Sequence, residues 1–147
     1  MAWQTNIICD DNGLRDLLAD TRTIAVLGIK TEAQSGQAAF YVASYLDNAG
    51  FDVIPVPVYY PEVKEILGRP VYRRLADIPQ DVDLVNVFRR SRDVPRHVDD
   101  ILAKKPKAVW LQLGIQNDEV ARTLAEAGIK VVQNRCLMVD HRQLARR

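Results

Sequence analysis

Two arginines that directly follow an apolar run are the residues of this chain best suited to bind an anion. The run begins at Val82 and ends at Phe88, and Arg89, Arg90 and Ser91 come next. Such a run is typical of a strand that is buried on both faces of a parallel sheet. Open α/β sheets bind their ligands at the carboxyl ends of the strands, where the two guanidinium groups would lie. Their planar, permanent charges favour a phosphorylated small molecule.

The two arginines also have a simpler interpretation, in which they are solvated at a loop end or form surface ion pairs with Asp93. We favour a contact with a ligand, because the residue type suits phosphate and the position suits a ligand edge. The neighbouring Arg73, Arg74 and Arg92 are expected to be solvated. The segment 69–107 holds ten Lys and Arg against six Asp, and this excess suits one small polyanion.

The loop after the first apolar run is a second candidate anion site. The run 23–28 closes with a glycine, and a helical pattern follows over 35–50, with Ser35 as the expected N-cap. Backbone amides at such a turn and at the beginning of a helix bind anions. Because Gly28 and Gly36 are eight positions apart, the loop is neither a G-x-G-x-x-G motif nor a Walker A loop.

Five short apolar runs alternate with helical patterns, which predicts βαβ units and a parallel sheet. The runs cover residues 23–28, 52–56, 82–88, 107–113 and 130–133. Right-handed crossovers then predict a single-domain Rossmann-like three-layer sandwich, an α/β fold with a mainly parallel five-stranded sheet of order 3-2-1-4-5. Its switch point would lie beside strand 1. The irregular segment 57–81, which is rich in proline and tyrosine, is expected to form a flap beside the site.

Further helices are expected around these strands. A leading helix is predicted over 12–20, and apolar residues from Val94 to Leu102 indicate another. Asn117 is the expected N-cap of a helix that Gly128 ends. The polar tail 140–147 is interpreted as frayed.

Length and composition fit one domain with a proper core. Of the 147 residues, 48% are hydrophobic and 27% are charged, so disorder is not expected. One domain is predicted over 1–147, with its core at about 10–137. The net charge of +1 argues against a protein that coats nucleic acid or an anionic membrane. Neither a signal peptide nor a membrane span is recognised, so a cytoplasmic protein is expected.

No complete catalytic or metal-binding group is visible in the sequence. Cys9 and Cys136 are far apart and are expected to be free thiols in a reducing compartment. A redox role for Cys136 is the minor alternative to an inert core position. His97 and His141 are interpreted as structural or solvated, so that no metal site is predicted. A binding module is therefore favoured over an enzyme.

A set of short motifs occurs along the chain in a characteristic order. The motifs are Thr23-Ile-Ala-Val-Leu-Gly28, Gly50-Phe-x-Val-Ile-Pro55, Glu65-Ile-Leu-Gly68, Val82-Asp-x-Val-x-Val-Phe-Arg-Arg90, Trp110-x-Gln-Leu-Gly114 and Asn134-Arg-Cys136. In combination they resemble the small, stand-alone CoA-binding proteins, relatives of the CoA-binding domain of succinyl-CoA synthetase. The resemblance covers about residues 10–137 and implies that coenzyme A, or an acyl-CoA, lies across the carboxyl edge of the sheet.

The resemblance also implies which residues contact coenzyme A (CoA). The pyrophosphate would lie against the first loop and the helix after it, the adenosine against the end of strand 2, and the rest along the ends of strands 3 to 5. The residues implied are Gly28, Ile29, Lys30, Ser35, Gly36, Gln37, Pro57, Val58, Phe88, Arg89, Arg90, Gln112, Gly114, Asn134, Arg135 and Cys136. The implied function is non-covalent binding by a carrier, sensor or regulatory module. It would act as a homodimer or with an unknown protein partner, without nucleic acid or membrane.

Two alternatives remain open at this point. An enzyme that binds a nicotinamide nucleotide could use the same fold, but it would need an acid at the end of strand 2. The chain has Pro57 and Val58 there, and no carboxylate before Glu62. The second alternative is an interaction module that has lost its nucleotide, because Gln34-Ser-Gly36 in the first loop and Pro57-Val58 depart from the family pattern.

Overall fold

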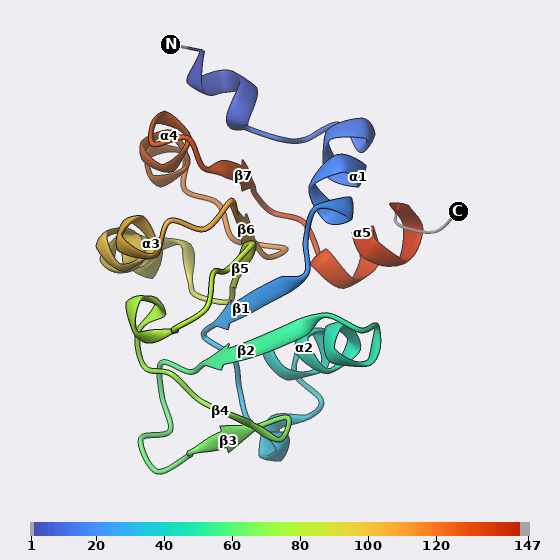
Figure 1. Ribbon diagram of the computed structural model, residues 1–147, viewed down its shortest axis with the longest axis vertical. Coiled ribbons are helices and arrows are strands. Elements are labelled where there is room, and N and C mark those ends of the chain that lie inside the picture. Colours follow the sequence, from blue (N-terminus) through green and yellow to red (C-terminus); the bar gives the residue numbers. More distant parts are fainter. Residues whose placement is uncertain (1, 145–147) are drawn as a thin grey trace.

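A sheet of five parallel strands forms the middle of the molecule, and helices cover both of its faces (Figure 1). The structure is a computed structural model that describes residues 2–144. The strands are β1 (Thr23–Leu27), β2 (Asp52–Val56), β5 (Leu84–Val87), β6 (Ala108–Leu111) and β7 (Lys130–Val132). Each lies within one of the five predicted apolar runs, so the α/β class and the parallel Rossmann-like sheet are confirmed.

The predicted order of these strands is wrong. The observed order is β2-β1-β5-β6-β7, so the third run pairs with the first run instead of lying beyond the second. An apolar run shows that a strand is buried, but it does not show which strand lies next to it. Here the irregular segment 57–81 carries the chain from β2 back past β1, and all four residues of β5 are buried in the sheet. The switch point therefore lies between β1 and β5.

The helices form two outer layers around the sheet. On one face lie α1 (Asp11–Ala19), α2 (Ala38–Asn48) and α5 (Leu137–Leu144), and on the other lie α3 (Val98–Lys104) and α4 (Asp118–Glu126) (Figure 1). Short 3-10 helices are η1 (Trp3–Asn6), η2 (Glu32–Gln34), η3 (Leu75–Asp77) and η4 (Ser91–His97). An apolar cluster fills the space on each face. In β1, Ile24 and Val26 belong to one cluster, whereas Ala25 and Leu27 belong to the other, as expected for alternating side chains.

The ends of α4 agree with the prediction. The side chain of Asn117 accepts a hydrogen bond from the N–H of Val120 at 3.1 Å, as an N-cap does. Gly128 follows the helix with a φ of +88° and ends it. The predicted leading helix is also confirmed, as α1.

The beginning of α2 differs from the prediction. The helix begins at Ala38, after Gln37, so Ser35 is not its N-cap. The residues before it form η2, which Thr31 caps by accepting a hydrogen bond from the N–H of Ala33 at 3.2 Å. The first loop therefore contains its own capped turn, which the spacing of apolar residues does not reveal.

The described part of the C-terminal tail is a helix rather than a frayed end. Residues 140–144 belong to α5, and residues 145–147 lie outside the described residues. Asp140 is 5% exposed, and its carboxylate accepts hydrogen bonds from the guanidinium group of Arg135 at 2.6 and 3.0 Å. This ion pair ties the first turn of α5 to the end of β7.

His141 is half-buried, although a place in a polar tail suggested exposure. Its Nδ1 lies 2.7 Å from the hydroxyl oxygen of Tyr45 on α2. Its ring also packs edge to face against Tyr45 and Phe51. These contacts join α5 to α2, and the residues around His141 form no pattern from which they could be predicted.

The segment 57–81 contains short elements that the sequence did not predict. They are β3 (Glu65–Ile66) and β4 (Arg69–Pro70), which pair as an antiparallel hairpin beyond β2 (Figure 1). The N–H of Leu67 in the turn donates to the carboxylate of Glu32 at 2.8 Å. Arg69 forms ion pairs with Asp47 and Asp52. The hairpin is therefore fastened to both the first loop and the β2 edge.

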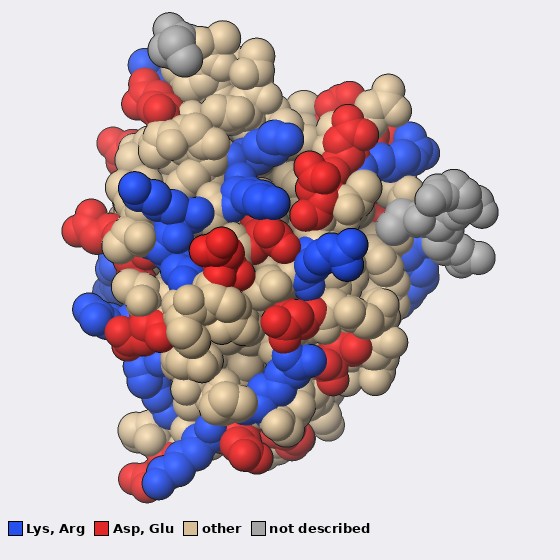
Figure 2. Space-filling model, viewed as in Figure 1, with Lys and Arg blue, Asp and Glu red and all other residues tan. Residues whose placement is uncertain are grey.

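Positive and negative side chains are interspersed over the face shown in Figure 2. This mixture agrees with the net charge of +1 and gives that face no large field of a single sign. None of the helices described in residues 2–144 is long and apolar enough to span a membrane.

Gly28 lets the ends of β1 and β5 come together. Its φ of +88° is in the left-handed region, and a Cβ at this position would overlap the carbonyl oxygen of Phe88. The N–H of Gly28 donates to the carbonyl of Val56 at 2.9 Å, and the N–H of Phe88 donates to the carbonyl of Leu27 at 2.8 Å. The glycine therefore lies where the ends of β2, β1 and β5 meet.

We expect Gly28→Ala to lower the free energy of unfolding by about 2–5 kcal/mol, because the left-handed backbone and the overlap both disfavour a side chain. Gly114→Ala is the matched control, since Gly114 has the same φ but open space around its Cβ position. Its loss should be only about 1–2 kcal/mol. Urea denaturation measures both values, and equal losses would contradict the steric argument.

Candidate functional site

A hollow of about 480 Å³ lies at the carboxyl edge of the sheet. It is lined by Ala39, Tyr59, Phe88, Arg89, Arg90, Leu113, Gly114 and Ile115. These residues follow β2, β5 and β6 or belong to the first turn of α2, so segments from both sides of the switch point meet around it. Open α/β sheets bind ligands at this place, and the hollow lies at the edge that the sequence predicted.

The hollow has a positive wall. Arg89 and Arg90 contribute their side chains to it, and the described residues that line it include no carboxylate. Ala39 adds the first turn of α2. The N–H groups of Phe40 and Tyr41 already donate to the carbonyl oxygen of Gln37, so those of Ala38 and Ala39 are the ones left for an anion. Both features favour a bound anion.

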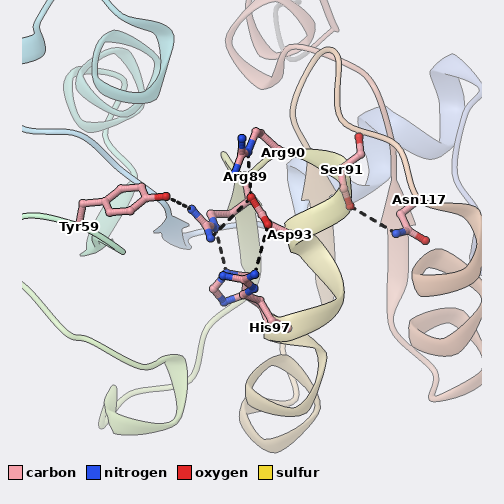
Figure 3. Close-up of polar contacts among 8 residues, drawn as sticks. Tyr59, Arg89, Arg90, Ser91, Asp93, His97 and Asn117 are labelled. Carbon is pink, nitrogen blue, oxygen red and sulfur yellow. Dashed lines mark hydrogen bonds and ion pairs between the residues drawn. The ribbon is translucent and has the colours of Figure 1, made fainter.

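Arg89 is a buried anchor of this wall (Figure 3). Its side chain is 6% exposed. The guanidinium group donates to Nε2 of His97 at 3.1 Å and to the hydroxyl oxygen of Tyr59 at 3.3 Å. The hydrogen bond from Arg89 and its charge lower the pKa of the Tyr59 hydroxyl, because they stabilise the deprotonated form. Arg89 therefore places a fixed positive charge at the hollow.

Asp93 is 5% exposed and pairs with three arginines next to this wall (Figure 3). Its Oδ2 accepts a hydrogen bond from Nε of Arg90 at 2.9 Å and lies 4.0 Å from a guanidinium nitrogen of Arg89. Its Oδ1 lies 3.5 Å from a guanidinium nitrogen of Arg96. The hydrogen bond from Arg90 is the main cause of a lowered pKa at Asp93, which keeps the carboxylate ionised. Both arginines thus form the ion pairs of the simpler interpretation, and their contact with a ligand stays a prediction.

His97 supports Arg89 as a hydrogen-bond acceptor. Because its Nε2 accepts from Arg89, the imidazole ring is neutral in this arrangement. Burial of the half-buried ring, and then the charge of Arg89, lower the pKa of His97. This position agrees with the structural role expected for His97.

Arg73 holds the loop that carries Tyr59. Its guanidinium group donates to the carbonyl oxygens of Tyr59 at 3.0 Å, Tyr60 at 2.8 Å and Val63 at 2.8 Å. Tyr60 has a φ of +64°, which is uncommon for a bulky residue and marks a sharp turn. Arg73 is exposed, as predicted, but it also fixes the shape of the loop.

The family described as the CoA binding domain matches residues 22–142 of the chain, from the start of β1 into α5. The chain belongs to the CoA-binding domain family. The resemblance found in the sequence motifs is therefore confirmed.

The chain is also similar to a curated protein and to several solved structures. The uncharacterized protein YneT of Bacillus subtilis (strain 168) is 30% identical over 128 residues, which is 87% of this chain and 91% of the relative. The solved structure of cell-free ID.343 from Thermus thermophilus is 39% identical, with a TM-score of 0.84 over 92% of this chain and 99% of that chain. A dinucleotide forming acetyl-coenzyme A synthetase 1 from Ca. Korarchaeum cryptofilum is 21% identical, with a TM-score of 0.64 over 80% of this chain and 27% of that chain. The last comparison shows a similar fold alone.

The first loop offers fewer free amides than the family resemblance implies. The N–H of Gly28 already donates to Val56, and the N–H of Lys30 donates to the carbonyl oxygen of Ala39 at 3.0 Å. Ile29, between them, is 1% exposed. The amides of Gly28 and Lys30 therefore hold the strand and helix ends together, and they are not the free donors that a phosphate cradle needs. The first turn of α2 reaches the hollow instead.

Other residues implied by the family lie around the first loop and the end of β2. Ser35, Gly36 and Gln37 are exposed before α2, and the side-chain oxygen of Gln37 accepts a hydrogen bond from Nζ of Lys30 at 2.6 Å. Pro57 is buried, and Val58 packs half-buried against an apolar cluster. A ligand contact for these residues stays a prediction.

Gln112 belongs to the interior rather than to the hollow. It is 4% exposed, and its Oε1 accepts hydrogen bonds from the side chain of Asn86 and the N–H of Leu137, both at 3.3 Å. Cys136 is half-buried against an apolar cluster, and both it and Cys9 are free thiols. Within residues 2–144, no group of three His, Cys, Asp or Glu side chains is placed to hold a metal ion.

The residues after β7 form hydrogen bonds with the rim of the hollow and with its neighbouring elements. The side-chain oxygen of Asn134 accepts a hydrogen bond from the N–H of Gly114 at 2.7 Å and so shapes the rim. Arg135 uses its guanidinium group to bind Asp140, and its carbonyl oxygen accepts from the indole nitrogen of Trp110 at 2.8 Å. In this structure the side chain of Arg135, which precedes α5, therefore holds the first turn of that helix.

Four lining residues were missed by reasoning from the sequence, namely Ala39, Tyr59, Leu113 and Ile115. Leu113 is 65% exposed and Tyr59 is 59% exposed, which is high for large apolar side chains. Leu113 was included in an apolar run and was therefore expected in a strand, although β6 ends at Leu111. The place of Leu113 beside Gly114 was the available signal, because a glycine after a strand marks the turn at the ligand edge.

We expect the stability of the protein to fall as the pH drops from about 7.5 to about 5, because burial lowers the pKa of both His97 and His141 from their usual value of 6.5. The unfolded chain takes up these protons more readily than the folded protein. The neutral rings therefore contribute to the free energy of unfolding at a pH above the pKa of histidine in the unfolded chain, and this contribution is lost as the pH falls below that pKa.

Urea unfolding at both pH values should be compared for the wild type, His97→Gln, His141→Gln and the double variant. Each single variant should lose part of the pH dependence, and the double variant should lose more. An undiminished dependence in the double variant would assign the effect to other groups.

Proposed function

We propose that the protein binds coenzyme A or an acyl-CoA non-covalently in the hollow at the carboxyl edge of the sheet. The observation that carries the proposal is the pair Arg89 and Arg90 in that hollow, at the switch point of a CoA-binding domain. Coenzyme A carries a pyrophosphate and a 3′-phosphate, and guanidinium groups bind phosphate oxygens strongly. The first turn of α2 adds backbone donors to the same space.

The other lining residues suit the neutral parts of this ligand. Phe88, Leu113 and Ile115 give apolar surface, and Tyr59 adds an exposed ring. Cofactor sites commonly combine such surface with a few polar groups. No atom lies within 4 Å of the Cβ position of Gly114, so the rim is open there. An adenine ring and a long neutral arm can use this mixture.

The proposed role is that of a carrier, sensor or regulatory module. The described lining residues include no serine, cysteine, histidine or carboxylate that could act as a nucleophile or base, and the hydroxyl oxygen of Tyr59 among them accepts a hydrogen bond from Arg89. His97, the nearby titratable ring, already accepts a hydrogen bond from Arg89. These residues therefore support binding better than catalysis. A cytoplasmic location and a homodimer or other protein partner remain predictions from the sequence.

Calorimetric titration with CoA, acetyl-CoA and NAD tests the proposal against its alternatives. We expect the protein to bind CoA or acetyl-CoA but not NAD. β2 ends at Val56, and neither this residue nor the following Pro57 and Val58 offers an acid for a ribose. Binding of NAD alone would overturn the proposal in favour of a nicotinamide enzyme. No binding at all would overturn it in favour of an interaction module.

We expect Leu113→Glu to weaken CoA binding about tenfold or more, because a carboxylate in the hollow would repel the phosphates. Leu113 is 65% exposed, so the change should not disturb folding. Val139→Glu, on α5 and outside the lining residues, is the matched control for a new charge at an exposed apolar position. Titration with CoA measures both variants, and equal affinities would place the ligand elsewhere.

A further inference from the structure

The arginines around Asp93 carry more positive charge than this one carboxylate neutralises. Arg89, Arg90 and Arg96 all lie within 4.0 Å of it, so three positive charges share one negative charge. Within residues 2–144, Asp93 is the ion-pair partner of each of the three. The excess charge next to the hollow would be balanced by an anion that carries two negative charges.

The three arginines differ in their freedom to move. Arg89 is buried and held by His97 and Tyr59. Arg90 lines the hollow, its side chain is 66% exposed, and its guanidinium group pairs with Asp93. Arg96 pairs with the other oxygen of the same carboxylate.

Arg90 can therefore move away from Asp93 without leaving the buried carboxylate unpaired. Asp93 keeps Arg96 and Arg89 as partners when Arg90 turns away, and an unpaired buried carboxylate is the state that is strongly unfavourable. The exposed side chain of Arg90 has room to change its rotamer. Asp93 thus holds Arg90 at the hollow and can release it.

We propose that Arg90 turns from Asp93 onto a phosphate monoester of the ligand, and that this contact makes the site select CoA over analogues that lack the 3′-phosphate. The inference rests on the proposed function and names the chemical group that decides specificity. A phosphate monoester carries a charge of about −1.5 to −2 near neutral pH, which matches the excess around Asp93. A pyrophosphate spreads its charge over two phosphorus atoms and suits the backbone amides at the first turn of α2.

The test is a titration of the wild type and of Arg90→Gln with CoA and with dephospho-CoA, which differs only in lacking the 3′-phosphate. The wild type should bind CoA about ten- to a hundredfold more tightly than dephospho-CoA. Arg90→Gln should lose most of this preference, with its affinity for dephospho-CoA changed by no more than about threefold.

Arg74→Gln is the matched control. Arg74 is 69% exposed and forms an i,i+3 ion pair with Asp77, as Arg90 does with Asp93, but it does not line the hollow. This variant should keep the preference for CoA. Urea unfolding of both variants checks that each remains folded.

The outcomes separate the inference from the proposed function. If the wild type binds CoA and dephospho-CoA equally, the inference is wrong and the proposed function stands. If Arg90→Gln weakens both ligands equally, Arg90 contacts the pyrophosphate, and the inference is again wrong. If neither ligand binds to the wild type, both proposals fall.

Discussion

The close approach of Gly28 to the carbonyl group of Phe88 is the constraint on which the ligand edge depends. β1 and β5 pair from Ile24 opposite Leu84 to Leu27 opposite Val87. The segments that follow the two strands come into contact once more, at Gly28. Beyond this point they turn to opposite faces of the sheet, one into α2 and the other into η4. The hollow lies where they part. A side chain at position 28 would push the strand ends apart, so the shape of the site follows from one missing Cβ atom.

The strands could be predicted because each buried strand leaves its own apolar signal, whereas their order could not. The neighbour of a strand depends on how the chain returns to the sheet, and the segment 57–81 gives no regular pattern from which to infer that path. The extent of α5 was missed for a similar reason. Its residues from Asp140 on look like a polar tail, but His141 contacts Tyr45, which is 96 positions earlier in the chain. A contact between residues so far apart produces no recognisable pattern in the sequence around either of them.

The residues of the candidate site likewise include some that could be predicted from their neighbours in the sequence and some that could not. Arg89 and Arg90 were found because a charged pair after a buried strand has a definite place in a parallel sheet. Gln112 also follows a strand, but its side chain faces the interior. The sequence does not show whether a side chain after a strand faces the hollow or the interior. Leu113 was missed because its place in an apolar run suggested a buried strand. Tyr59 was missed because the segment 57–81 was expected beside the site only as a whole, without a particular residue.

The three hydrogen bonds from Arg73 to the loop of Tyr59 have a kinetic consequence. Binding loops that order only when a ligand arrives reduce affinity and slow association. Here the carbonyl groups of Tyr59, Tyr60 and Val63 are already held, so the loop is assembled in advance. Rotamer changes of exposed side chains take only picoseconds to nanoseconds. The rate of association should therefore be set by diffusion to the sheet edge, and ligands should differ mainly in how long they stay bound.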